Sequence, residues 1–233
     1  MNYYKIRRKK KISDRLNRLS VTFWIIVVTT IVSVVSFILL NISPDYIDYL
    51  ALKPSNILQG KYFWTILTHM FVHGGIAHLF INMFVLFSLG SLSERIIGRK
   101  RFFWFYLIAG LFAGILSVVL AGFFGTTELG ARIFSSPDIF MVGASGAIFA
   151  IAGLYVILLP RLKFMIIFLP FFSLPAYIMI PLMLIVMWII TVLLNAPIGN
   201  VAHFGGFLVG IIYGLYLKNK YANKVKILQR MFR

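Results

Sequence analysis

Long apolar stretches alternate with short polar ones along most of this chain. A helix needs about 20 apolar residues to cross about 30 Å of hydrocarbon, and runs of that order recur throughout the sequence. The runs are Val21–Leu40, Ile76–Leu92, Phe102–Phe124, Ile139–Leu159, Met165–Leu194 and Val201–Leu217. This pattern predicts an all-α polytopic membrane protein, a bundle of six transmembrane helices.

The long fifth stretch differs from a plain spanning helix because it contains Pro170, Pro175 and Pro181. At ~1.5 Å per residue it is too short for two spans with a turn between them. We therefore expect Phe168–Pro175 to approach along the membrane interface, with a single helix following it.

The loop Asn41–Gly75 between the first two spans carries a shorter apolar piece, Tyr62–Val72, that begins with three aromatic residues. About a dozen apolar residues are too few for a span, and Trp and Tyr favour the headgroup level. We expect this outer loop to be partly embedded in the membrane.

The basic residues predict the orientation. Of 23 Lys and Arg, 20 fall on one side of the six-span topology, and the other side holds only Lys53, Lys61 and Arg132. Cytoplasmic loops carry the excess of Lys and Arg, so we expect a multi-pass cell-membrane protein with both termini in the cytosol. The chain would then comprise a basic tail over residues 1–20, a membrane domain over 21–217 and a second basic tail over 218–233.

Composition also indicates that lipid is the solvent. The chain of 233 residues is 61% hydrophobic and 12% charged, whereas soluble domains carry about 25% charged residues. A net charge of +17 in a soluble protein would suggest nucleic acid as a partner. The topology explains the charge here, so no nucleic-acid partner is expected. The apolar run after the basic start is too long for a cleavable signal peptide, which predicts a retained first span.

Few polar groups lie within the spans, and such groups are costly enough to mark functional sites. His78 and Asn82 stand four residues apart, so they share one face near the outer end of the second span. A pair of this kind could instead be an interhelical hydrogen-bonding pair without chemistry.

Ser145 lies among small residues, in the run Gly143-Ala-Ser-Gly146. If the fourth span starts at Ile139, Ser145 lies ~9 Å below its outer end. Small residues are common where helices touch in membranes, so helix packing is the alternative interpretation of this run.

His203 begins the sixth span, and Gly206 and Gly210 follow it on the same helix face. Glycines let a neighbouring helix come close, which would bring the imidazole near that helix. The alternative is a packing face with a hydrogen-bonding histidine.

These polar residues become more informative when they are taken together. In the six-span topology Ser145, His203, His78 and Asn82 approach the same outer leaflet from three helices. A neutral imidazole is the usual base for a hydroxyl nucleophile. Backbone N–H groups and the side chains of Asn82 and His78 could stabilise a tetrahedral oxyanion. No carboxylate falls within an expected span, so the chemistry would use a Ser145–His203 dyad. The chain has no Cys, which excludes thiolate metal sites, and we expect neither a metal nor a cofactor.

The chain resembles the rhomboid family of intramembrane serine proteases from about residue 60 to residue 214. The resemblance rests on the His78 and Asn82 pair, the run from Glu94-Arg95 to Phe102, the Gly143–Gly146 box, and Ala202-His203 with its trailing glycines. It implies a six-helix bundle with a partly membrane-embedded loop between helices one and two. It also implies substrates that are transmembrane segments of other proteins, cleaved near the outer leaflet.

By the same resemblance, Ser145 is the nucleophile, His203 is the general base, and Asn82 and His78 lie beside the oxyanion. Phe149 matches an aromatic residue that stacks on the catalytic imidazole. Many members of the family carry an aromatic-Arg pair in the outer loop, where this chain has Trp64-Thr65. The loop geometry is therefore the point at which the resemblance is weakest.

Two other classes of protein fit part of the pattern. A transporter or channel usually has a site at the midplane, often with carboxylates, and inverted repeats are typical; this chain shows neither feature. A catalytically inactive relative that binds membrane proteins would be expected to lack the serine or the histidine, and both are present. The residues do not indicate a physiological substrate, a cleavage sequence or an oligomeric state.

Overall fold

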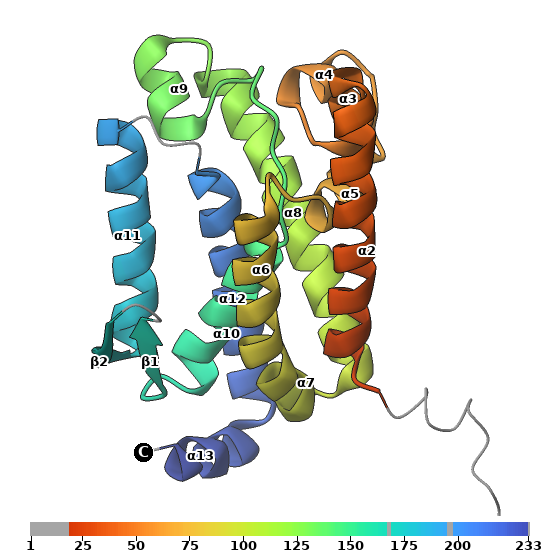
Figure 1. Cartoon of the computed structure of the whole chain (residues 1–233). Coiled ribbons are helices and arrows are strands. Elements are labelled where there is room, and N and C mark those ends of the chain that lie inside the picture. The colour runs from red at the N-terminus through yellow and green to blue at the C-terminus, as the bar shows by residue number, and fades with distance from the viewer. Residues whose placement is uncertain (1–18, 167–168, 195–197, 233) are drawn as a thin grey trace, which may run out of the picture.

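The chain forms a bundle of roughly parallel and antiparallel helices (Figure 1). The structure, a computed structural model, describes residues 19–166, 169–194 and 198–232. Within these ranges, 5 helices are long and apolar enough to cross a membrane. They are α2 (Val21–Ile42), the continuous helix Ile76–Ile97, α8 (Arg99–Phe124), α11 (Ala176–Leu194) and α12 (Asn200–Lys220). The predicted membrane-helix bundle is confirmed.

The second of these spans is built from three pieces in one line. A π-helical turn separates the two α-helical parts, and all three pieces follow one another without a break. The pieces are α6 (Ile76–Val85), η3 (Leu86–Gly90) and α7 (Ser91–Ile97).

The sixth helix of the bundle, α10 (Ser145–Leu158), has only 14 residues. At ~1.5 Å per residue it is about 21 Å long, which is less than the hydrocarbon thickness. The expected span Ile139–Leu159 is therefore wrong at its outer end, because the chain before Ser145 is not helical. Gly143 has φ +121°, which no helix contains. Met141 pairs with Leu52 as an isolated antiparallel bridge.

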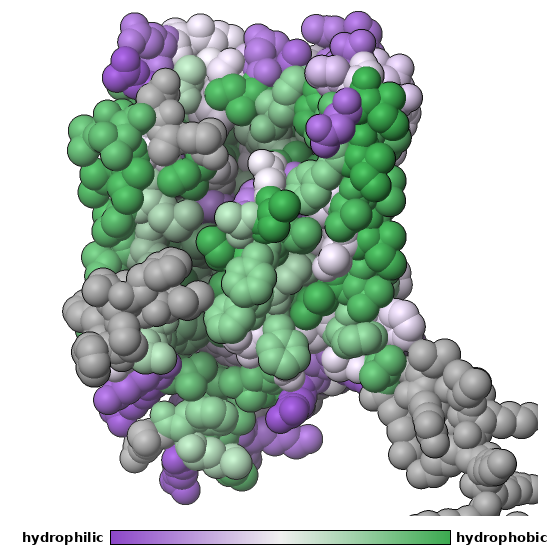
Figure 2. Space-filling model, in the orientation of Figure 1, coloured by the Kyte–Doolittle hydropathy of each residue, from purple (hydrophilic) through white to green (hydrophobic). Residues whose placement is uncertain are grey.

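The bundle buries polar groups and exposes apolar ones along α2. Thr22, Thr29 and Ser33 are fully buried, whereas Ile31 and Ile38 are more than half exposed. Apolar side chains cover the flanks in Figure 2, and hydrophilic residues gather at the two ends. A helix with this pattern is suited to lipid and not to water.

The outer loop between α2 and α6 contains five short helical segments. Two of them, α5 and η2, fill the space between α2 and α8. Met70, Val72 and His73 on or beside η2 are each 1% exposed. The segments are η1 (Pro44–Tyr46), α3 (Ile47–Leu50), α4 (Pro54–Leu58), α5 (Thr65–Thr68) and η2 (His69–Phe71).

The remaining elements lie before, between or after the spans. They are α9 (Glu128–Phe134), β1 (Lys163–Ile166), β2 (Leu169–Pro175) and the C-terminal helix α13 (Ala222–Met231). Strands β1 and β2 pair in an antiparallel arrangement, a small addition to an otherwise helical fold that the sequence did not predict. Of the expected interfacial approach Phe168–Pro175, Phe168 lies outside the described residues and the rest forms β2. Helix α11 begins directly after Pro175 and contains Pro181 within its second turn.

Helices α10 and α12 touch through their backbones. A β-carbon on Gly206 would collide with the carbonyl oxygen of Gly146, and one on Gly210 would collide with that of Ala150. Gly153 of α10 lies equally close to the backbone of α12. Glycines at these positions therefore permit a separation that no other residue would allow.

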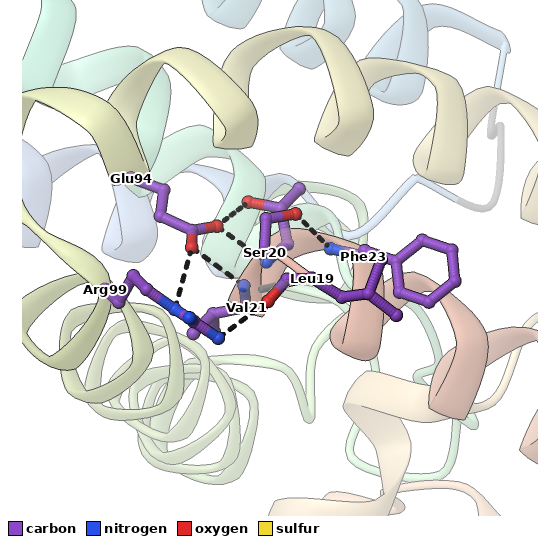
Figure 3. A network of polar contacts seen from close by, with 7 residues as sticks. Leu19, Ser20, Val21, Phe23, Glu94 and Arg99 are labelled. Atoms are coloured by element: carbon purple, nitrogen blue, oxygen red, sulfur yellow. Dashed lines mark hydrogen bonds and ion pairs between the residues drawn. The ribbon is translucent and has the colours of Figure 1, made fainter. Parts of the chain in front are cut away.

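Glu94 ties the end of α7 to the start of α2 (Figure 3). Its carboxylate is buried and accepts hydrogen bonds from the backbone N–H groups of Val21 and Thr22, each at 2.8 Å. The Thr22 hydroxyl donates a third bond. Arg99 lies 3.6 Å from the carboxylate and donates to the Leu19 carbonyl. A carboxylate therefore does lie within a spanning helix, because the second span continues to Ile97 and not only to Leu92.

Candidate active site

Ser145 and His203 are hydrogen-bonded to each other although 58 residues separate them in the chain. Ser145 is the first residue of α10, and His203 lies in the first turn of α12. The Ser145 Oγ is 2.7 Å from the His203 Nε2. The contact of Gly206 with Gly146 brings the two helices close enough for this bond. The structure therefore brings together the two residues that the sequence analysis selected as nucleophile and base.

The His203 ring is held by stacking. The Phe149 ring lies 4.5 Å from it, centroid to centroid, with the planes 29° apart. The second ring nitrogen of His203, Nδ1, is buried and has no hydrogen-bond partner among the described residues. Glu94, the carboxylate buried at the end of α7, is in the same continuous helix as His78. It is 16 residues, or about 24 Å, from His78, which is too far from the His203 ring to orient it. No described carboxylate orients the imidazole, so the pair is a dyad.

His78 lies near Ser145, against Gly143. A β-carbon on Gly143 would stand 3.2 Å from the His78 Nε2 and 3.8 Å from the Ser145 Oγ. The imidazole and the hydroxyl therefore flank one small space that the missing side chain leaves open. His78 is in contact with His73 as well, with ring centroids 5.0 Å apart.

Asn82 is close to His78 but has no hydrogen bond to Ser145. Its side-chain amide donates to the His78 carbonyl one turn earlier, at 2.9 Å, and it is 5% exposed. In this conformation the Asn82 amide nitrogen is engaged within its own helix. Of the four predicted polar residues, the structure thus joins Ser145 to His203 directly and sets His78 near Ser145. The described hydrogen bond of the Asn82 side chain is within its own helix.

Two further histidines hold the segment that leads into Ser145, and the sequence analysis did not assign them a role. The His69 carbonyl accepts from the Gly143 N–H at 2.8 Å. The His73 Nε2 accepts from the Ala144 N–H at 3.5 Å, so the proton of this ring is on Nδ1, which lies 3.0 Å from the Ser33 Oγ. These bonds attach the backbone on the N-terminal side of Ser145 to the outer loop.

The pairing of Leu52 with Met141 adds a third attachment of the same kind, with N–H···O distances of 3.0 and 2.7 Å. The outer loop is therefore hydrogen-bonded to the extended chain before Ser145 at Met141, Gly143 and Ala144. The only sign in the sequence that His69 and His73 have a role is their spacing, four residues apart in an apolar segment. It could not identify a role because the partners of these residues come from distant segments.

The outer loop has its own internal bonds at the Trp64-Thr65 pair, where many rhomboids carry Arg. The Thr65 hydroxyl donates to the Tyr62 carbonyl at 2.7 Å, and the Trp64 Nε1 donates to the Tyr49 carbonyl at 3.0 Å. Thr65 is fully buried. These contacts close the loop without an arginine.

A hydroxyl bonded to an imidazole, next to a small space with possible donors, is the arrangement that serine hydrolases use for acyl transfer. The fold and this arrangement define a polytopic membrane protein with a serine–histidine dyad. A family model described as "Rhomboid domain" matches residues 60–220, which is more than half of the chain. The chain belongs to the rhomboid family of intramembrane proteases.

Several curated relatives agree with this assignment. The chain is 28% identical to "Rhomboid protease GlpG" of Haemophilus influenzae, over 73% of this chain and 78% of the relative. It is 38% identical to "Rhomboid protease GluP" of Bacillus subtilis, over 49% of this chain and 20% of the relative. It is 30% identical to "RHOMBOID-like protein 4" of Arabidopsis thaliana, over 71% of this chain and 37% of the relative. The match thus spans less than half the length of the last two relatives.

Proposed function

We propose that this protein is an intramembrane serine endopeptidase that cleaves transmembrane segments of other membrane proteins by a Ser145–His203 dyad. The observation that carries the proposal is the 2.7 Å bond between the Ser145 Oγ and the His203 Nε2. A hydroxyl is a poor nucleophile until a base takes its proton. A neutral imidazole with its proton on Nδ1 is ready to accept one on Nε2.

In the proposed reaction His203 takes the Ser145 proton as Oγ attacks the scissile carbonyl carbon. The carbonyl oxygen becomes an oxyanion, and His203 then gives the proton to the leaving amine as the amide bond breaks. A water molecule then attacks the acyl carbon while the same imidazole takes its proton. The ester bond to Oγ breaks, the second product leaves with a new carboxyl group, and the imidazole returns the proton to Oγ. Gly146 and Phe149 support these steps by keeping α12 close and the imidazole in place.

The oxyanion would occupy the space beside Gly143. The side chain of His78 and the Ser145 hydroxyl border this space. The backbone N–H of Ser145 would donate to the oxyanion, and Asn82 could supply a further donor after a change of rotamer. Donors of this kind typically contribute 10²–10³ in rate each. Asn82 therefore acts after substrate binds, since its amide is engaged elsewhere in the described conformation.

We further propose that both termini face the cytosol and that cleavage occurs near the outer leaflet of the cell membrane. The asymmetry of Lys and Arg supports this orientation, and Ser145 lies toward the end of the bundle opposite the basic one. A substrate helix hides its amides in hydrogen bonds, so the scissile region must unwind before attack. The basic tails, residues 1–20 and 218–233, would lie outside the membrane domain of residues 21–217.

The test is labelling by a fluorophosphonate probe, which reacts with an activated serine. Purified protein in detergent should become labelled, and Ser145→Ala and His203→Ala should not. Ser117→Ala is a matched control, because Ser117 is also buried but donates only to its own helix, at the Ala113 carbonyl. Labelling that persists in Ser145→Ala would overturn the proposed mechanism.

A further inference from the structure

A cavity with a basic lining opens at the end of the bundle where α10 and α12 finish. Its volume is about 480 Å³. Helix α13 crosses this end of the bundle (Figure 1), and the Gln229 side chain ties it to α10 by donating to the Ile157 carbonyl at 3.2 Å. The residues that matter for the cavity are Leu159, Arg161, Lys226, Gln229, Arg230 and Phe232.

The three cations of the cavity have no acidic partner among the described residues. Arg161, Lys226 and Arg230 are exposed, and the ion pairs of the described chain do not include them. The last Asp or Glu of the sequence is Asp138, so no acidic side chain follows on the segment that carries Arg161, Lys226 and Arg230. Three like charges around one cavity favour the binding of an anion.

Apolar side chains lie beside the three cations, and they favour an anion that carries an apolar group over a free inorganic anion. Ile227 and Met231 lie four residues apart on α13 and are 61% and 74% exposed, so they form one apolar strip on that helix. Leu159 and Phe232 add apolar surface inside the cavity. A free phosphate would gain nothing from these groups, whereas a phospholipid carries acyl chains that would cover them.

We propose that this cavity binds the headgroup of an anionic phospholipid from the adjacent leaflet. The phosphate would lie among Arg161, Lys226 and Arg230, and the acyl chains would run beside Ile227 and Met231. A helix with basic and apolar faces is suited to the plane of the membrane interface. Basic pockets at the cytoplasmic ends of transmembrane helices bind anionic headgroups by this chemistry. The proposal does not depend on the catalytic role of Ser145.

The test is native mass spectrometry of the purified full chain in detergent, with phosphatidylglycerol and phosphatidylcholine of the same acyl chains. The first lipid to bind should be phosphatidylglycerol, in preference to phosphatidylcholine. Each of Arg161→Gln, Lys226→Gln and Arg230→Gln should weaken its binding about fivefold, and the triple variant should lose the preference. Lys226→Arg keeps the charge and should bind like the parent chain.

Lys224→Gln is the matched control, because it removes one charge from the same helix but Lys224 does not line the cavity. It should leave the preference unchanged. An equal loss in this control would show that general surface charge is responsible and would overturn the site. Equal binding of the two lipids by the parent chain would overturn it as well. Complete displacement of the lipid by millimolar inorganic phosphate would assign the cavity to a free anion and overturn the lipid proposal.

Discussion

Replacing Gly206 with alanine tests whether the close approach of α10 and α12 is what holds the proposed dyad together. The added β-carbon would overlap the Gly146 carbonyl oxygen and lie 2.7 Å from its carbon. Both are backbone atoms, so no side chain can turn away and the helices must separate by about an ångström, since non-bonded carbon atoms prefer 3.5–4.0 Å. The 2.7 Å bond between Ser145 and His203 would then exceed the ~3.2 Å limit of a good hydrogen bond.

A misplacement of this size can cost about 10²-fold in rate while every catalytic group remains present. We therefore expect Gly206→Ala to lower kcat/KM by about that factor for a transmembrane substrate reconstituted in liposomes. Thermal unfolding in one detergent should show a moderate loss of stability, since overpacking costs about 1–3 kcal/mol.

Gly205→Ala provides the control. Gly205 is next in the chain but faces α8, where a β-carbon would stand 2.9 Å from the end of the Leu116 side chain. This substitution should reduce stability to some degree and leave turnover near that of the parent chain. Parental turnover in a folded Gly206→Ala protein would refute the argument, because the dyad would then not depend on this helix contact.

Further predictions concern the dyad, the oxyanion donor, the buried carboxylate and the topology. In the liposome assay, Ser145→Ala and His203→Ala should each abolish cleavage nearly as completely as the double variant, because the two residues act as a unit. Asn82→Ala should keep a rate lower by about 10²–10³; a loss as complete as that of Ser145→Ala would contradict its role as one donor among several. Glu94→Gln should lower the free energy of unfolding by about 1–3 kcal/mol, since buried donors lose an acceptor; fluorophosphonate labelling should persist, and its loss would contradict a purely structural role. Single cysteines within residues 126–138 should react with an impermeant maleimide in intact cells; labelling of a cysteine in either tail would contradict the orientation.

Much of the bundle could be predicted because span length and apolar composition follow directly from the thickness of the bilayer. The residue at which α10 starts could not be predicted in this way. Ile139 and the apolar residues after it suit a helix or a strand equally well, and the decision comes from the φ of Gly143 and the pairing of Met141 with Leu52. Such long-range pairing has no local periodicity that would reveal it.

The same limit applies to the site. Residue type, topology and the resemblance to the rhomboid family together selected Ser145 and His203, because other hydroxyl groups, such as those of Ser33 and Ser117, also lie within the spans. The bond between Ser145 and His203 depends on a tertiary contact through Gly206. The support that His73 gives to Ala144 depends on three separate segments meeting, so sequence spacing alone could not predict it.

The short length of α10 has a consequence for hydration. Its first internal bond runs from the Ile148 N–H to the Ala144 carbonyl, at 3.1 Å, so the N–H groups of Ser145, Gly146 and Ala147 have no acceptor within the helix. In hydrocarbon, each unsatisfied group of this kind costs several kcal/mol. In a membrane, such groups are tolerated only where the surrounding protein or a water-filled cavity satisfies them. We expect water to supply these acceptors, so the broken helix that exposes the Ser145 hydroxyl would also admit the water that the proposed hydrolysis consumes.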